Sequence, residues 1–274
     1  MEALIEEALP HITKGKADAT KNQYGVAARK LQTILADFSP QQVMPKHVAQ
    51  MRRALTDTPN MANRCITVLR LVFGYAVEEQ LVDSNPCTGI KRLEAKRDRL
   101  VLRDEFERIH AKAPPRLQLM MELAYLTGQR LLDVVGIHRT ELKDDGIYFR
   151  QEKTNAQLVV RWTPQIRDVV ERAKRLGGKV EGVWLFRSRH GKPPAYGTVR
   201  DQWTKACTDA GVADTTLRDL RAMSATATRK QGKDATALLG HASPAMTRRY
   251  LRDREVPLVD GPVLDSIGQS TGEG

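Results

Sequence analysis

A highly charged run at residues 91–99 follows a helix-breaking stretch, Asp83-Ser84-Asn85-Pro86, and divides the chain into two parts. Proline disfavours helix in the residue before it, and a run of charged side chains offers little apolar surface to bury. The two flanking parts should therefore fold as separate domains. The expected parts are an N-terminal domain at residues 1–90, a basic linker at 91–100, a second domain at 101–255 and a C-terminal tail at 256–274.

Apolar residues at helical spacing predict that the N-terminal part consists of helices joined by short turns. The first long helix is expected over residues 19–38 and ends at Ser39-Pro40, and two more follow over 45–55 and from about residue 59. Basic side chains on these helices either contact the phosphates of a polyanion or form an ordinary solvated surface, and both readings stay open. The candidates for phosphate contact are Lys46, Arg52, Arg53, Arg64 and Arg70.

The second part mixes helices with one short hairpin. Two runs rich in β-branched and aromatic residues, 147–150 and 158–162, are expected to pair around a turn at residues 153–156. The expected fold class is therefore mainly α with a small β-sheet (α+β). The expected helices span 103–113, 116–126 with a continuation through 130–135, 164–176, 196–210, 216–230 and 235–239, and a last one reaches Tyr250.

Several function classes are disfavoured by what the sequence lacks. No stretch approaches the roughly 18 to 20 apolar residues of a membrane span, and the N-terminus has no secretory signal, so we expect a cytoplasmic protein without a membrane partner. Cys65, Cys87 and Cys207 are scattered, and the histidines show no metal-ligand spacing, so we expect neither a disulfide framework nor a metal. No P-loop is present, and no cofactor is expected.

The charge balance indicates a polyanionic partner. The net charge is +11, and it is unevenly placed. Residues 1–95 carry 12 Lys and Arg against 10 Asp and Glu, a net +2, whereas the other residues carry 32 against 23, a net +9. Charge alone leaves a merely basic protein equally open.

Four sequence islands in the second part decide between these readings. In their order and spacing they resemble the catalytic domain of the tyrosine recombinases, also called the phage integrase family, over roughly residues 100–252. The N-terminal helices resemble that family's core-binding domain. The islands are Leu-Thr-Gly-Gln-Arg at 126–130, Glu-Lys-Thr-Asn at 152–155, Leu-Arg-Asp-Leu-Arg at 217–221, and Leu-Gly-His at 239–241 followed by a Thr-x-x-Tyr that ends at 250.

The resemblance implies a role for each matched residue. Arg130 and Arg221 correspond to the two arginines that grip the non-bridging oxygens of the scissile phosphate, and Tyr250 corresponds to the nucleophile. Lys153 matches the lysine that protonates the departing 5′ oxygen. His241 matches a position, occupied by His or Trp, that hydrogen-bonds the phosphate.

Elementary chemistry supports these roles. Phosphoryl transfer concentrates negative charge on oxygens, and two guanidiniums supply permanent cations that can replace a metal ion. A tyrosine with a pKa near 10 costs roughly 4 kcal/mol to ionise at pH 7, and a cationic cluster lowers that cost. Asp133 lies one helical turn beyond Arg130 and is expected to orient its guanidinium.

Arg218 departs from the family pattern, which usually has histidine at this position. Arginine cannot accept a proton. We therefore expect Arg218 to add a third phosphate contact, with His241 or water taking the proton of Tyr250. Taken singly, each residue also fits a structural role, such as a surface arginine, a turn lysine or a packed tyrosine; the joint occurrence in family order favours catalysis.

The implied function is a site-specific recombinase that cleaves and rejoins double-stranded DNA at core sites through a 3′-phosphotyrosyl intermediate. It would act as a homotetramer on DNA, passing through a Holliday junction, with its two domains clamping the duplex. About a dozen residues precede the first long helix expected, so a separate arm-site-binding domain is not expected. Integration or excision of a phage or mobile element is the first interpretation. Resolution of chromosome or plasmid dimers, a type IB topoisomerase and a catalytically impaired DNA-binding regulator remain as alternatives.

Overall fold

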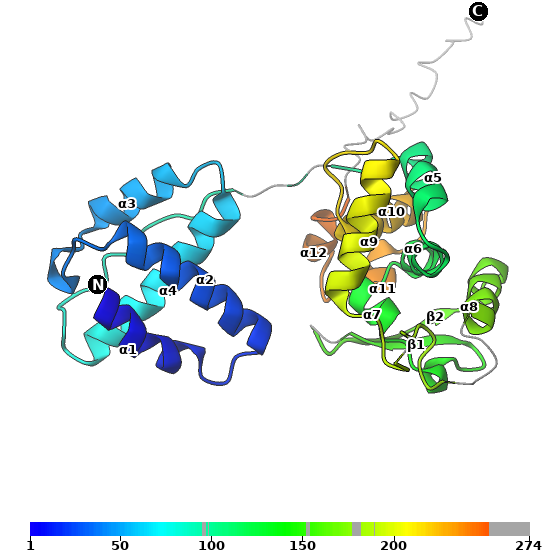
Figure 1. The fold of residues 1–274 in the computed structure, drawn as a ribbon, viewed down its shortest axis with the longest axis horizontal. Coiled ribbons are helices and arrows are strands. Elements are labelled where there is room, and N and C mark those ends of the chain that lie inside the picture. The colour runs from blue at the N-terminus through cyan, green and yellow to red at the C-terminus, as the bar shows by residue number, and fades with distance from the viewer. Residues whose placement is uncertain (95–96, 98, 152–153, 177–181, 189, 252–274) are drawn as a thin grey trace, which may run out of the picture. The chain divides into compact units, whose positions relative to one another are not determined.

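The computed structural model of the protein describes residues 1–94, 97, 99–151, 154–176, 182–188 and 190–251. The chain forms two compact units, residues 1–97 and 98–274 (Figure 1). Each unit has a hydrophobic core of its own. The expected linker at 91–100 lies partly outside the described residues, and the expected tail at 256–274 lies wholly outside them.

In the N-terminal unit, helix α4 packs against α1, α2 and α3. Apolar residues along α4 form the centre of this core, and Ile66, Leu69 and Phe73 are fully buried. The segment before the first expected helix proves to be a helix itself, because Ile5 and Ala8 supply an apolar face that is also buried. The elements are α1 (Glu2–Thr13), α2 (Asp18–Ile34), the 3-10 turn η1 (Pro40–Gln42), α3 (Pro45–Ala54) and α4 (Pro59–Glu78).

The chain beyond α4 is tied back onto this unit. The Asn63 side chain donates from Nδ2 to the Leu93 carbonyl over 2.8 Å and accepts at Oδ1 from the Leu93 N–H over 2.8 Å. Arg52 Nη1 donates to the Lys91 carbonyl over 3.0 Å. The first residues of the expected linker are therefore part of the helical unit.

The second unit is arranged around helix α6, which packs against α8, α9 and α10. Leu117, Met120 and Met121 on α6 are buried in its core. The predicted fold class, mainly α with a small sheet, is confirmed. The elements are α5 (Arg103–Lys112), α6 (Pro115–Thr127), α7 (Leu131–Val135), the 3-10 turn η2 (Arg139–Glu141), β1 (Gly146–Arg150), β2 (Gln157–Arg161), α8 (Pro164–Leu176), α9 (Tyr196–Asp209), α10 (Leu217–Lys230), α11 (Ala235–Leu239) and α12 (Pro244–Arg248).

Strands β1 and β2 form the predicted antiparallel hairpin. Ile147 pairs with Val160, and Arg150 at the end of β1 pairs with Gln157 at the start of β2. Alternate residues of β1 are buried, as expected for a strand with one face on a core. Lys153 falls between the strands in sequence and lies outside the described residues.

The helix expected to continue through residue 135 is interrupted, and that prediction was wrong. Helix α6 ends at Thr127, because Gly128 takes the left-handed conformation with φ of 66°. Helix α7 begins only at Leu131, which leaves Arg130 in an extended conformation with φ −63° and ψ 146°. Because of this interruption, Arg130 is not part of a helix. Its side chain projects from the extended segment between α6 and α7.

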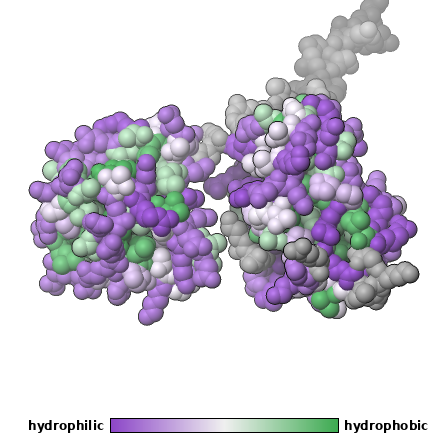
Figure 2. Space-filling view, in the orientation of Figure 1, coloured by the Kyte–Doolittle hydropathy of each residue, from purple (hydrophilic) through white to green (hydrophobic). Residues whose placement is uncertain are grey.

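Apolar side chains lie mainly in the two cores. The visible face of each unit is largely hydrophilic, with apolar residues in small scattered groups (Figure 2). The three cysteines are buried free thiols. None of the described helices has the length and apolar character needed to cross a membrane.

Candidate active site

The guanidinium of Arg221 is buried at the start of helix α10 and binds the ends of two other helices. Its Nη1 donates to the Gly128 carbonyl over 2.6 Å, and its Nη2 donates to the Leu239 carbonyl over 2.6 Å. Both carbonyls lie at the C-terminal end of a helix capped by a left-handed glycine, where the last carbonyls have no partner within their own helix. The Thr-Gly and Leu-Gly sequences thus build the acceptors that hold this arginine.

Arg221 keeps its positive charge despite burial. Only 2% of the residue is exposed. Burial lowers its pKa to about 10, and the neighbouring charge of Arg130 acts in the same direction. At neutral pH the group is still protonated, so it can supply a fixed cation to a bound anion.

Arg130 reaches the same site from the turn before α7. Its Nη1 donates to Gln151 Oε1 over 2.5 Å and lies 3.7 Å from Asp133 Oδ2. The Asp133 side chain is 5% exposed and therefore faces the protein, where sequence analysis placed it beside Arg130. Arg130 is therefore closer to the neutral amide of Gln151 than to the carboxylate of Asp133.

Tyr250 lies two residues beyond helix α12, with its hydroxyl in the arginine cluster. Its N–H donates to the Thr247 carbonyl over 2.8 Å, and the residue is 8% exposed. Arg218 Nη2 donates to the Tyr250 hydroxyl over 3.0 Å. The guanidinium carbons of Arg218 and Arg221 lie 5.1 and 5.5 Å from the ring centroid, and the His241 ring lies at 5.2 Å. The ring is anchored by a small apolar cluster of Ala222, Ala225, Ala235 and Leu239.

His241 is held in one neutral tautomer. Its Nε2 faces Arg221 Nη2 at 3.2 Å, and because arginine only donates, Nε2 must be the acceptor. The proton then sits on Nδ1, which lies 3.0 Å from Thr247 Oγ1. Burial lowers the His241 pKa to about 4, with further lowering by Arg221, Arg130 and Arg218. The imidazole is therefore uncharged at neutral pH.

The same cations act on the phenol. Burial raises the pKa of Tyr250, but the charges of Arg218, Arg221 and Arg130, together with the Arg218 hydrogen bond, outweigh burial and lower it. The phenolate is thus easier to form here than in water. A phenol whose ionised form is stabilised beside permanent cations is suited to attack a phosphate.

Five of the six predicted catalytic residues meet in this cluster, and the sixth, Lys153, lies outside the described residues. Sequence reasoning missed Gln129, Gln151 and Thr247, which hold the cluster together. Gln129 lies within the island at 126–130 and Gln151 directly precedes the one at 152–155; both amides are buried, which the sequence by itself does not signal. Among the described residues, no group of His, Cys, Asp and Glu is arranged to hold a metal ion.

The basic residues of the N-terminal unit differ in their surroundings. Lys46 and Arg53 are exposed, whereas Arg52 and Arg64 are partly buried. Arg52 holds the Lys91 carbonyl, as described above, so one of its donors has a structural partner. Phosphate contact by these residues stays a prediction.

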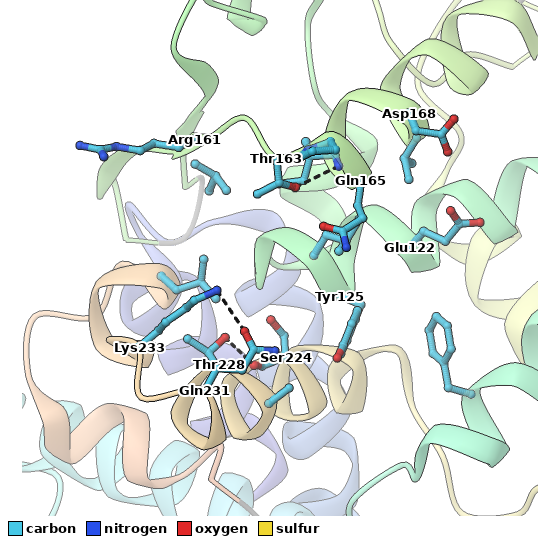
Figure 3. A pocket seen from close by; sticks show the side chains of 18 of the residues that line it. Glu122, Tyr125, Arg161, Thr163, Gln165, Asp168, Ser224, Thr228, Gln231 and Lys233 are labelled. Carbon is cyan, nitrogen blue, oxygen red and sulfur yellow. Dashed lines mark hydrogen bonds between the residues drawn. The ribbon is translucent and has the colours of Figure 1, made fainter.

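A separate cavity of about 1270 Å³ lies elsewhere in the second unit. It is lined by residues of α5, α6, β2, α8, α10 and α11, among them Tyr125, Ser224 and Thr228 (Figure 3). None of the clustered arginines, His241 or Tyr250 lines it. The cavity is therefore distinct from the candidate active site.

Comparison with known proteins identifies the family. Residues 99–255, more than half of the chain, match the phage integrase family. The chain belongs to the phage integrase family. Its membership makes it a site-specific recombinase, and the cluster of Tyr250 and the arginines lies inside the matched region.

Individual relatives agree with this membership. The chain is 27% identical to the integrase of Enterobacteria phage 434 over 262 residues, covering 88% of this chain and 72% of that protein. It is 28% identical to the integrase of Escherichia phage HK022 over 260 residues, with the same coverages. Its fold is similar to that of lambda integrase (75–356), crystallised as a dimer bound to a COC′ core site, with a TM-score of 0.82 at 24% identity over 97% of this chain and 99% of that one.

Proposed function

We propose that this integrase-family chain cleaves and rejoins DNA at specific core sites through a 3′-phosphotyrosyl intermediate on Tyr250. One observation carries the proposal: a phenol with a lowered pKa, three arginines from two distant segments and a neutral imidazole lie together in one cluster. Arg218 donates to the Tyr250 hydroxyl over 3.0 Å, which supports a phosphate binding beside the proposed nucleophile. The cluster has cations for the phosphate oxygens and an oxygen nucleophile for the phosphorus.

In the cleavage step the Tyr250 oxygen bonds to the phosphorus and the bond to the 5′ oxygen breaks. Lys153 is proposed to give its proton to that leaving oxygen. Arg130 and Arg221 would bind the non-bridging oxygens and stabilise the charge that collects there. Rejoining is the reverse: a 5′ hydroxyl attacks and the phenolate leaves, so one phosphodiester is exchanged for another and no energy source is consumed.

The Tyr250 proton is proposed to leave to water. Arg218 and the other guanidiniums have no lone pair to receive it. His241, with its pKa lowered to about 4, is a weak base, and its Nε2 already accepts from Arg221. The cations favour the ionised phenol, so a strong general base is not required.

The decisive experiment uses a nicked suicide substrate, in which the cleaved 5′ fragment diffuses away and traps the protein on DNA. We expect a covalent adduct with the wild-type chain and none with Tyr250→Phe. Tyr196→Phe is the matched control, because Tyr196 is 47% exposed and outside the cluster. An adduct that persists in Tyr250→Phe would refute the assignment.

The biological role is proposed to be integration and excision of a phage or mobile element, acting as a tetramer on DNA in the cytoplasm. The relatives named above are phage integrases, and a lambda integrase tetramer bound to a Holliday junction has the same fold, with a TM-score of 0.82 at 23% identity over 94% of this chain and 79% of that one. Recombination between two matched core sites, assayed on a plasmid, tests the role. Relaxation of supercoiled DNA without a specific site would instead indicate topoisomerase activity.

A further inference from the structure

Gln151 is a fully buried polar residue at the centre of the site, and the reaction as described gives it no role. It directly follows β1, and its main chain closes the base of the hairpin turn. Its N–H donates to the Ala156 carbonyl over 2.8 Å, and its carbonyl accepts from the Asn155 N–H over 2.8 Å. Its backbone position is therefore fixed by the hairpin.

The side-chain amide of Gln151 uses all of its hydrogen-bonding capacity. Its Oε1 accepts from Arg130 Nη1 over 2.5 Å and from Thr154 Oγ1 over 2.9 Å. Its Nε2 donates to Gln129 Oε1 over 2.8 Å and to the Leu239 carbonyl over 2.9 Å. The orientation is unambiguous, because the arginine can only donate and the carbonyl can only accept.

The Leu239 carbonyl connects this amide to the second arginine. It accepts from Arg221 Nη2 over 2.6 Å as well as from Gln151 Nε2. A continuous path thus runs from Arg130 through the Gln151 amide and the Leu239 carbonyl to Arg221. Two arginines that lie far apart in sequence are spaced by one amide and one carbonyl.

Gly240 shows how closely the two turns approach. A Cβ at this position would lie 2.8 Å from Gln151 Nε2, and the backbone has φ of 61°. The absence of a side chain at Gly240 therefore permits the amide to reach the Leu239 carbonyl.

We propose that Gln151 is a positioning residue that sets the separation and orientation of Arg130 relative to Arg221. The inference rests on the proposed function, in which both arginines bind one phosphate. A neutral amide suits the task, because it orients Arg130 without cancelling the charge that the phosphate needs. A carboxylate in its place would hold the guanidinium but would also compete with the phosphate for it.

A double-mutant cycle on single-turnover adduct formation tests this. Gln151→Leu removes the amide, and Arg130→Lys keeps the charge but removes the planar fork that has to be oriented. We expect Gln151→Leu alone to slow cleavage at least about tenfold, because small misplacements of a reacting group are costly. In the Arg130→Lys background the same substitution should change the rate by less than about threefold. Equal losses in both backgrounds, or no loss in either, would overturn the proposal.

Controls separate positioning from general damage. Gln157→Leu, an exposed glutamine of the same hairpin, should leave the rate unchanged. If Gln151→Leu does not fold by circular dichroism, Gln151→Met replaces it in the cycle with the same expectation, because the flexible methionine also removes the amide that accepts from Arg130.

A measurement on the free protein makes the test independent of DNA chemistry. Arg130 helps to lower the His241 pKa, so the carboxylate of Gln151→Glu should raise that pKa from about 4 in an NMR titration. Gln157→Glu should not raise it. A His241 pKa that is unchanged in Gln151→Glu, or that shifts equally in Gln157→Glu, would overturn the placement of Gln151. A wild-type chain that forms no adduct, while His241 responds as expected, would refute the proposed function instead.

Discussion

Removing Arg218 is expected to shift the pH dependence of DNA cleavage to higher pH. Arg218 donates to the Tyr250 hydroxyl over 3.0 Å, and its guanidinium carbon lies 5.1 Å from the ring centroid. Burial raises the Tyr250 pKa, and Arg218 is the strongest of the neighbours that bring it below 10. Arg218→Leu leaves burial in place and takes away the main opposing charge.

The size of the shift follows from the hydrogen bond. A bond to a charged group contributes about 1.5–3 kcal/mol, and the exposure of Arg218 to solvent reduces this to roughly 1–2 kcal/mol. Arg218→Leu should therefore raise the Tyr250 pKa. Because about 1.36 kcal/mol is a factor of ten, cleavage should be roughly tenfold slower at pH values where the phenol is mostly protonated, and the difference should disappear at higher pH.

Single-turnover adduct formation on a suicide substrate, measured between about pH 6 and 10, gives the profile. Arg248→Leu is the control, because it removes the same charge from an exposed site, whereas the charges that lower the Tyr250 pKa are those of Arg218, Arg221 and Arg130. The rate of adduct formation in Arg248→Leu should rise over the same pH range as in the wild-type chain. A deficit in Arg218→Leu that is equal at every pH would show that Arg218 acts on the phosphate alone and would refute the argument from phenol ionisation.

Four further outcomes are expected. Arg221→Leu should abolish the adduct and lower the melting temperature, because the buried Gly128 carbonyl loses the Arg221 donor at a cost of about 1–3 kcal/mol, while the Leu239 carbonyl keeps the Gln151 donor; thermal unfolding measures the loss. Gly240→Ala should slow cleavage, since the new methyl group displaces the Gln151 amide, and a rate equal to wild type contradicts this. Arg53→Ala should reduce the slope of log affinity against log salt by about 1 if this residue touches a phosphate; an unchanged slope assigns it to the solvated surface. Arg218→His should retain adduct formation, and complete loss would argue against equivalence with the family's histidine.

The clustering of Arg130, Arg218, Arg221, His241 and Tyr250 was predictable because each lies in a short motif whose local structure is encoded beside it. In the Leu-Gly-His sequence, the left-handed Gly240 ends α11 and points the Leu239 carbonyl at Arg221. The hairpin was predictable for the same reason, since its alternation and its turn are local. The interruption after Thr127 was not foreseen, because the apolar pattern continues across Gly128 and only the conformation of that glycine stops the helix.

The residues that hold the site together were beyond sequence reasoning. The Gln151 amide bonds to partners 22 and 88 positions away in the chain, and Gln129 bonds to the Leu238 carbonyl 109 positions away. No periodicity or spacing carries information over such separations. A buried amide looks like any other polar residue until the turns that it joins have been brought together.

The hydrogen-bond partners of Arg221 explain how a buried arginine can still act on an anion. Its guanidinium is held by the Gly128 and Leu239 carbonyls and faces the neutral His241 ring, all acceptors without net charge. A carboxylate would have bound it more strongly, but it would have cancelled the field that lowers the Tyr250 pKa and attracts the phosphate. The cost appears as an Arg221 pKa lowered to about 10, which still leaves the group charged at neutral pH. These acceptors orient the Arg221 charge without neutralising it. Without bound DNA the cluster therefore keeps an uncompensated positive charge, which favours both the Tyr250 phenolate and a bound scissile phosphate.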